Sequence, residues 1–63
     1  MKAIINVKKG SGFEMHNGEK FEVDFSKVVT CKGKLIIPIK GVRKEYPNNY
    51  TDFSQDELIF TEQ

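Results

Sequence analysis

The chain lacks tryptophan and contains one cysteine and one histidine among its 63 residues. A single cysteine, Cys31, cannot form a disulfide within the chain, so no covalent link compensates for a small core. Such low cysteine usage is typical of a reducing compartment, and we expect a cytoplasmic protein. Because the one histidine, His16, is far in sequence from Cys31, a metal site would lack its usual ligands, and we expect neither a metal nor another cofactor.

Long apolar segments are also absent. Residues 1–7 are interrupted by Asn6 and followed by Lys8 and Lys9, so they are too short for a signal-sequence core or a membrane span. No stretch of ten residues has the 3.6-residue periodicity of an amphipathic helix, which argues against a sheet covered by a helix. No catalytic motif is present, and a domain of this size has little volume for an enclosed active site, so we expect no enzymatic activity.

Short segments of alternating apolar and polar residues occupy most of the chain, a pattern typical of strands with one buried face. Turn signals separate these segments: Asn17-Gly18 tolerates positive φ, and Lys32-Gly33 predicts a hairpin. The pattern indicates five strands in a single domain that spans residues 1–63. The expected strands are residues 1–7, 20–26, 35–40, 50–53 and 58–61, with residues 27–31 either continuing the second strand after a bend or forming a separate short strand.

The alternation assigns inner faces to the first three strands. Pro38 lies inside the third strand, and because proline lacks the N–H that a central strand donates, we expect an edge position or a bulge there. The predicted core side chains are Met1, Ala3, Ile5 and Val7 in the first strand, Phe21, Val23 and Phe25 in the second, and Leu35, Ile37 and Ile39 in the third.

A capping signal close to the C-terminus favours one β architecture over another. Ser54 is followed three residues later by Glu57, which is the pattern of a capping box at the start of a helical turn. One turn between the last two of five strands predicts an all-β, small five-stranded SH3-like barrel with one short 3-10 turn before the last strand. An OB-fold also has five strands, but it usually needs a full helix between the third and the fourth.

Three segments carry a resemblance to known proteins: residues 1–8 (MKAIINVK), 17–23 (NGEKFEV) and 51–58 (TDFSQDEL). Through them the chain resembles short bacterial and phage-associated proteins with SH3-like barrels, a group with no established activity, so the resemblance implies only the fold and a bacterial or phage origin. The turn and strand of residues 17–23 also weakly resemble the KOW barrels of ribosomal and transcription proteins. Eukaryotic signalling SH3 domains fit worse, because their peptide groove depends on a tryptophan.

Charge is unevenly distributed along the chain. Residues 1–44 contain all ten Lys and Arg residues and four acids, whereas residues 45–63 contain five acids and no base. Cations beside aromatic rings form a general surface for single-stranded nucleic acid, so RNA or single-stranded DNA binding is one hypothesis. The net charge of +1 is low for a dedicated nucleic-acid binder. We therefore expect first a protein–protein interaction module whose partner is another protein or a second copy, with no membrane or metal partner.

Loop residues are the best candidates for contact with a partner. We expect residues 13–17 and residues 43–50 to adjoin, as the corresponding loops do in SH3-like barrels. Aromatic rings would supply apolar contact area, and cations would select acidic or phosphate-bearing partners. His16 and Cys31 have plainer roles, as a solvated loop residue and as a small strand residue. The predicted binding residues are Phe13, Tyr46, Tyr50, Lys9, Arg43 and Lys44.

Overall fold

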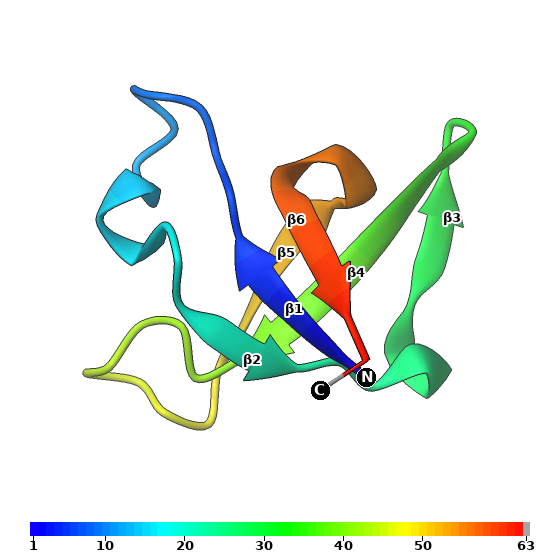
Figure 1. Ribbon diagram of the computed structural model, residues 1–63. Helices are drawn as coiled ribbons and strands as arrows, with labels where there is room; N and C mark the ends of the chain where they lie inside the picture. The colour runs from blue at the N-terminus through cyan, green and yellow to red at the C-terminus, as the bar shows by residue number, and fades with distance from the viewer. Residues whose placement is uncertain (63) are drawn as a thin grey trace.

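Six short strands and three 3-10 turns make up the computed structural model, which describes residues 1–62 (Figure 1). The strands are β1 (Lys2–Ile5), β2 (Lys20–Glu22), β3 (Val29–Cys31), β4 (Lys34–Lys40), β5 (Tyr50–Ser54) and β6 (Leu58–Thr61). The turns are η1 (Glu14–His16), η2 (Phe25–Lys27) and η3 (Gln55–Glu57). The all-β class and the 3-10 turn before the last strand are as predicted, but the prediction of five strands is wrong.

The strands form two three-stranded antiparallel sheets, in the orders β2-β1-β6 and β3-β4-β5. Figure 1 shows β1 and β6 crossing β4 and β5 at a steep angle, and the inner faces of the two sheets pack on each other. The register places Ile5 opposite Leu58 in one sheet and Ile37 opposite Phe53 in the other. Among residues 1–62 the sheets do not close into a barrel, because β2, β6, β3 and β5 remain as edge strands.

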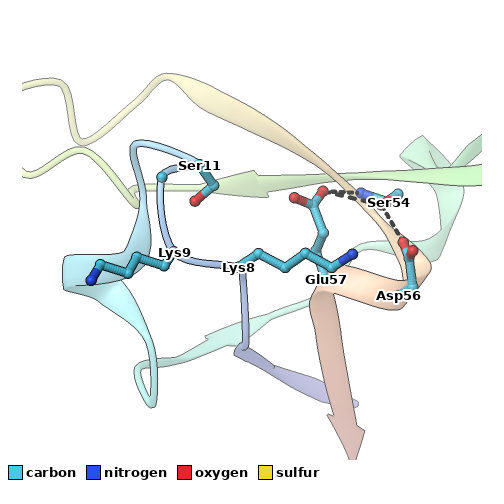
Figure 2. Close-up of a pocket in the computed structure, with 7 residues that line it drawn as sticks. Lys8, Lys9, Ser11, Ser54, Asp56 and Glu57 are labelled. Carbon is cyan, nitrogen blue, oxygen red and sulfur yellow. Dashed lines mark hydrogen bonds between the residues drawn. The ribbon is translucent and has the colours of Figure 1, made fainter.

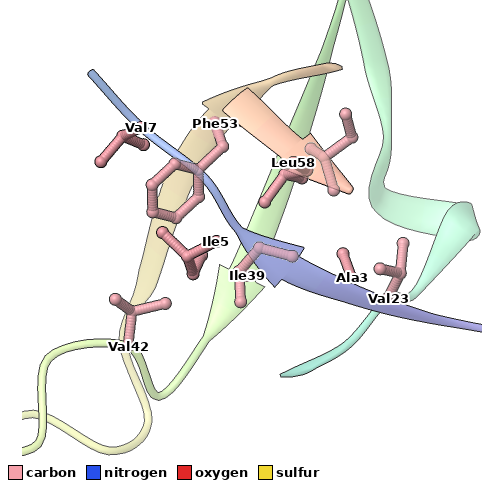
Figure 3. Packing of buried hydrophobic residues seen from close by; sticks show 9 residues of the cluster. Ala3, Ile5, Val7, Val23, Ile39, Val42, Phe53 and Leu58 are labelled. Atoms are coloured by element: carbon pink, nitrogen blue, oxygen red, sulfur yellow. The ribbon is translucent and has the colours of Figure 1, made fainter. Parts of the chain in front are cut away.

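Nine apolar side chains form one core between the sheets (Figure 3). Ile5, Ile37 and Ile39 are fully buried, as the alternation predicted, and burial of each side chain contributes about 1.5–3 kcal/mol. Val42 is buried as completely, although it lies in the charged loop after β4, whereas Met1 was predicted inside and is exposed. The core residues are Ala3, Ile5, Val7, Val23, Ile37, Ile39, Val42, Phe53 and Leu58.

The predicted second strand ends early, at Glu22. The Asp24 carboxylate accepts hydrogen bonds from the Ser26 N–H at 3.1 Å and from the Ser26 hydroxyl at 2.6 Å, and Asp24 caps turn η2. Such local bonds from a short polar side chain compete with the strand ladder. As a result Phe25, predicted to face the core, is 55% exposed. The same interruption separates β2 from β3 and accounts for the sixth strand.

Pro38 lies in β4, the central strand of its sheet, rather than in an edge strand. It is opposite Asp52 of β5, but the pairing between β4 and β3 ends at Ile36. Antiparallel alternation directs the nitrogen of Pro38 toward the β3 side, where the ladder has already ended, so no ladder hydrogen bond is lost. At Pro38, β4 therefore has a neighbouring strand on one side only, as an edge strand would, although β4 is the central strand of its sheet.

Both predicted turn signals are present. Ser54 and Glu57 form the capping box before β6, and the N–H of Ser54 donates to the Glu57 carboxylate at 2.9 Å. Lys32 and Gly33 form a two-residue hairpin turn between β3 and β4, with φ of 51° and 80°. Positive φ at both positions is what a turn matched to the twist of a hairpin requires.

Candidate interaction surface

The loop between β1 and β2 is held by its own polar side chains. Asn17 accepts a hydrogen bond from the Val7 N–H at 2.8 Å and donates one to the Val7 carbonyl at 3.0 Å. The Glu14 carboxylate accepts from the N–H groups of Gly10 and Gly12, two residues with positive φ. These backbone donors, Gly10 foremost, hold the pKa of Glu14 below its usual value. The loop therefore presents its side chains from a fixed backbone.

Phe13 turns from this loop toward the core. Its ring lies 5.6 Å from the ring of Phe53 in an edge-to-face arrangement and 6.3 Å from the ring of His16. Phe13 is half-buried and packs against the core cluster, whereas Met15 is the exposed large apolar residue of the same loop. The structure thus gives Phe13 a packing role, and contact between Phe13 and a partner stays a prediction.

The loop between β4 and β5 is anchored by the buried side chain of Val42 and closed by backbone hydrogen bonds. The Gly41 N–H donates to the Asn49 carbonyl at 3.1 Å, and the Tyr46 N–H donates to the Arg43 carbonyl at 2.9 Å. This closure brings the Arg43 guanidinium to 5.5 Å from the centroid of the Tyr46 ring. Because Tyr46 is 51% exposed, these two predicted binding residues form one exposed cation–aromatic pair.

The two loops meet at an ion pair between Lys44 and Glu19. Lys44 Nζ lies 3.3 Å from Glu19 Oε1, and His16 Nδ1 lies 3.1 Å from Glu19 Oε2. The hydrogen bond with His16, and then Lys44, hold the pKa of Glu19 below its usual value. The Lys44 ammonium also lies 5.0 Å from the centroid of the Phe21 ring. Lys44 is thus engaged within the molecule, and His16 is a half-buried partner of Glu19 rather than the solvated residue that was predicted.

Tyr50 borders a shallow depression between β2 and β4, with a volume of about 370 Å³. The side chain of Tyr50 is 45% exposed, and Lys27 of η2 lies 5.4 Å from its ring centroid. Lys40 is directly opposite Tyr50, and Pro38 is the diagonal neighbour of Tyr50 on the same face of the sheet. The lining residues are Glu22, Val23, Asp24, Pro38, Lys40 and Tyr50.

Lys9 lines a different depression, of about 460 Å³, between the start of the first loop and η3 (Figure 2). The Ser54 hydroxyl donates to the Asp56 carboxylate there, and this bond is the main reason why the pKa of Asp56 is lowered. Lysines and carboxylates both line the depression, so it has no uniform charge for a phosphate. The lining residues are Lys8, Lys9, Gly10, Ser11, Ser54, Asp56 and Glu57.

The predicted binding residues therefore fall into separate places. Arg43 and Tyr46 form a pair, Tyr50 borders the depression at β2 and β4, and Lys9 lines the depression between the first loop and η3. Sequence reasoning missed Lys27, Pro38 and Lys40 as neighbours of Tyr50. Alternation in β4 was enough to place Pro38 and Lys40 on one outer face, but no sequence signal paired that face with Tyr50.

No group of three or more histidine, cysteine, aspartate or glutamate side chains within residues 1–62 is placed to hold a metal ion. No helix in this part of the chain is long and apolar enough to cross a membrane. Comparisons with protein-family models, curated proteins and solved structures gave no match. The geometry of the exposed side chains is therefore the basis for a functional inference.

Proposed function

We propose that the chain has an SH3-like fold in an open form, two packed sheets rather than a closed barrel, whose second strand is divided by η2. In this assignment β2 and β3 are the two halves of that strand, one in each sheet. A strand that bends and passes from one sheet to the other is a usual way to connect sheets that pack at a steep angle. Antiparallel pairing of β1 with β6, and the turn η3 before β6, support the assignment.

Within this fold the chain serves as a non-catalytic module that binds another protein. The observation that carries the proposal is the exposure of two tyrosines whose rings are each accompanied by a cation. Tyr46 has Arg43 beside its ring, and Tyr50 has Lys27. Tyrosine and arginine are enriched at the positions that dominate interface affinity, and tyrosine loses little conformational entropy on binding.

The depression beside Tyr50 indicates the chemistry of the bound segment. Pro38 and the ring of Tyr50 supply apolar surface, and the charged lining residues are the cation of Lys40 and the carboxylates of Glu22 and Asp24. A protein segment with an apolar residue between side chains of opposite charge matches this surface, because its apolar part covers Pro38 and Tyr50, its carboxylate faces Lys40 and its cation faces Glu22 and Asp24.

Nucleic-acid binding is the second candidate function. The Arg43–Tyr46 pair favours it, since a cation beside an exposed ring is suited to a phosphate and a stacked base. The engagement of Lys44 by Glu19, and the carboxylates near Lys9, reduce the basic surface available to phosphates. Protein binding is therefore the function that the geometry supports best.

Capture of partners from a bacterial lysate by the tagged protein tests both candidates. We expect a protein that remains bound after nuclease treatment and at moderate salt, and that is lost when Arg43→Ala and Tyr46→Ala are combined. A control that removes one cation and one exposed ring elsewhere, Lys20→Ala with Phe25→Ala, should keep the partner, since both side chains are exposed.

Equal capture by the Arg43/Tyr46 double variant and the wild type would refute the proposal that this surface binds the partner. Recovery of nucleic acid whose binding falls steeply with salt would instead support the second candidate. Tyr50→Ala, tested separately, shows whether the depression between β2 and β4 belongs to the same binding surface.

A further inference from the structure

Strand β6 is an edge strand without the residues that usually protect an edge. Residues 58–61 contain no charged residue and no proline, and Ile59 and Phe60 are 50% and 38% exposed. Ile59 is opposite Ile4 of β1, and the Asn6 N–H bonds to the Glu57 carbonyl. The alternation of an antiparallel ladder then directs the N–H and C=O groups of Phe60 away from β1, toward the open edge.

Strand β3 is a second open edge. It is flanked by lysines, whereas β6 is flanked by the acids Glu57 and Glu62. All three residues of β3 are exposed, and within residues 1–62 it pairs only with β4. Because Cys31 and Lys34 form the pair next to the two-residue turn, the N–H and C=O groups of Thr30 point to the open edge. Lys27 and Lys32 flank this strand, and residues 25–44 contain no acid, whereas residues 45–63 contain no base.

Two exposed apolar residues lie at inward-facing positions beside these edges. Leu35 alternates with the buried Ile37 and Ile39, and Phe60 is opposite the buried Ala3, yet both Leu35 and Phe60 are exposed. Figure 1 shows the reason: the β3–β4 hairpin projects away from β6. The inner faces of the sheets are therefore uncovered at this end of the core.

We propose that β3 of one copy pairs antiparallel with β6 of a second copy. A register with Thr30 opposite Phe60 joins two residues whose backbone groups both point outward. On the inner face, Phe60 of the second copy then lies near Leu35 of the first copy, because Leu35 is opposite Thr30 in the β3–β4 hairpin. The contact covers apolar surface that a single copy leaves exposed to water.

The charges beside the two edges are complementary in this register. Lys32 approaches Glu57 of the second copy at one end, and Lys27 approaches Glu62 at the other. Pairing of β6 with another β6 would bring Glu57 close to Glu62, and pairing of β3 with β3 would bring Lys27 close to Lys32. Like charges across a strand pair are destabilising, so pairing of unlike edges is favoured.

This contact is head-to-tail, because each copy contributes a different edge. Every added copy leaves one β3 and one β6 free, so association continues beyond a dimer unless a ring closes. The contact uses neither the Arg43–Tyr46 pair nor the residues that line the depression at Tyr50, although it shares Lys27, which lies beside the Tyr50 ring. It goes beyond the proposed binding of another protein, and the two proposals stand or fall separately.

A mixing experiment with two blocked copies tests the head-to-tail contact. Thr30→Pro removes the outward N–H of β3 and leaves β6 intact, whereas Ile59→Lys places a cation on β6 and leaves β3 intact. Sedimentation velocity of the wild type should show mass that rises with concentration above the 7.2 kDa of one copy. Each variant alone should associate at least about tenfold more weakly, and an equimolar mixture should form a 1:1 dimer.

Two other outcomes of this experiment refute the proposal. The first is a wild type that remains monomeric up to millimolar concentration. The second is association of Thr30→Pro alone as strong as that of the wild type, since that result assigns the contact to two β6 strands. A circular dichroism spectrum of each variant verifies that the β fold is retained.

Cross-linking gives a measurement that does not depend on the proline variant. The proposed register places Cys31 of one copy directly opposite Ile59 of the next, in a pair whose Cα atoms are about 4.5 Å apart. Ile59→Cys treated with oxidised glutathione should therefore yield a ladder of covalent multimers. The wild type, whose one cysteine is Cys31, mixed with Ile59→Cys/Cys31→Ala should give mainly the mixed disulfide dimer. No ladder from Ile59→Cys, or no excess of the mixed dimer over the two symmetric dimers, contradicts the register.

Discussion

The side-chain amide of Asn17 pairs with both backbone groups of Val7, as a neighbouring strand would. Its oxygen accepts from the Val7 N–H at 2.8 Å, and its nitrogen donates to the Val7 carbonyl at 3.0 Å. Val7 itself is buried in the core. A single side chain thus extends the ladder of the first sheet to Val7, two residues beyond the end of β1.

Asn17→Ala should destabilise the protein by about 1–2 kcal/mol, because two backbone groups of Val7 lose their partners. Urea denaturation followed by circular dichroism measures the change. Asn17→Asp retains the acceptor but replaces the donor with an oxygen that faces the Val7 carbonyl, so it should not restore the wild-type stability. Asn48→Ala, at an exposed position of the other loop, is the control and should change the stability by less than about 0.5 kcal/mol.

Phe13→Ala should lower the free energy of unfolding by about 2 kcal/mol, less than for a fully buried phenylalanine. The reason is the loss of the edge-to-face contact with Phe53 and of packing against the core. Tyr46→Ala should change the same quantity by less than about 0.5 kcal/mol. Equal effects of the two substitutions would contradict the division between a packing ring and an exposed ring.

The pKa of Glu19 should be lower in the folded protein than its ordinary value of 4.5. A carboxylate whose folded pKa is depressed contributes stability above pH 4.5, and this contribution is lost as the pH falls through the folded pKa. NMR titration of the side-chain carboxyl carbon measures it directly. His16→Ala should raise the pKa more than Lys44→Met, since the bond with His16 is the larger cause, and Lys20→Met should leave it unchanged.

Lys32 is not the residue type that best fits its position in the hairpin turn between β3 and β4. Lys32 has a φ of 51°, a conformation that asparagine adopts more readily than lysine. Lys32→Asn should therefore stabilise the protein by up to about 1 kcal/mol. Gly33→Ala should destabilise it by a similar amount through backbone strain alone, because no atom lies within 4 Å of the added Cβ. Thermal unfolding at one fixed protein concentration checks both.

Much of the fold could be predicted from the sequence where local signals agree with the final packing. Alternation correctly placed Ala3 and Ile5 inside, and the strand at residues 58–61 has the bounds that were expected. The failure at Phe25 has a local cause, since Asp24 and Ser26 form a turn that the apolar alternation concealed. Val42 was missed because a lone apolar residue in a charged loop has no periodicity.

The candidate surface was harder to predict from the sequence than the fold, because it depends on contacts between segments that are distant in sequence. The pair of Arg43 and Tyr46 is local, and both residues were predicted. The ion pair of Lys44 with Glu19 and the position of Lys27 at Tyr50 follow only from the way the two sheets pack. Nearness in sequence suggested that Tyr46 and Tyr50 act together, whereas the fold gives them different neighbours.

The pairing of Lys2 with Thr61 has a consequence for the order in which the protein is made. The sheet of β3, β4 and β5 joins consecutive strands, so it can assemble as soon as they emerge from the ribosome. Of the six described strands β1 emerges first, yet one of its two neighbours is β6, the last of the six to be synthesised. The nascent chain therefore carries an incomplete first sheet until β6 has been synthesised, and this interval is when it is most open to chaperones and to misassembly.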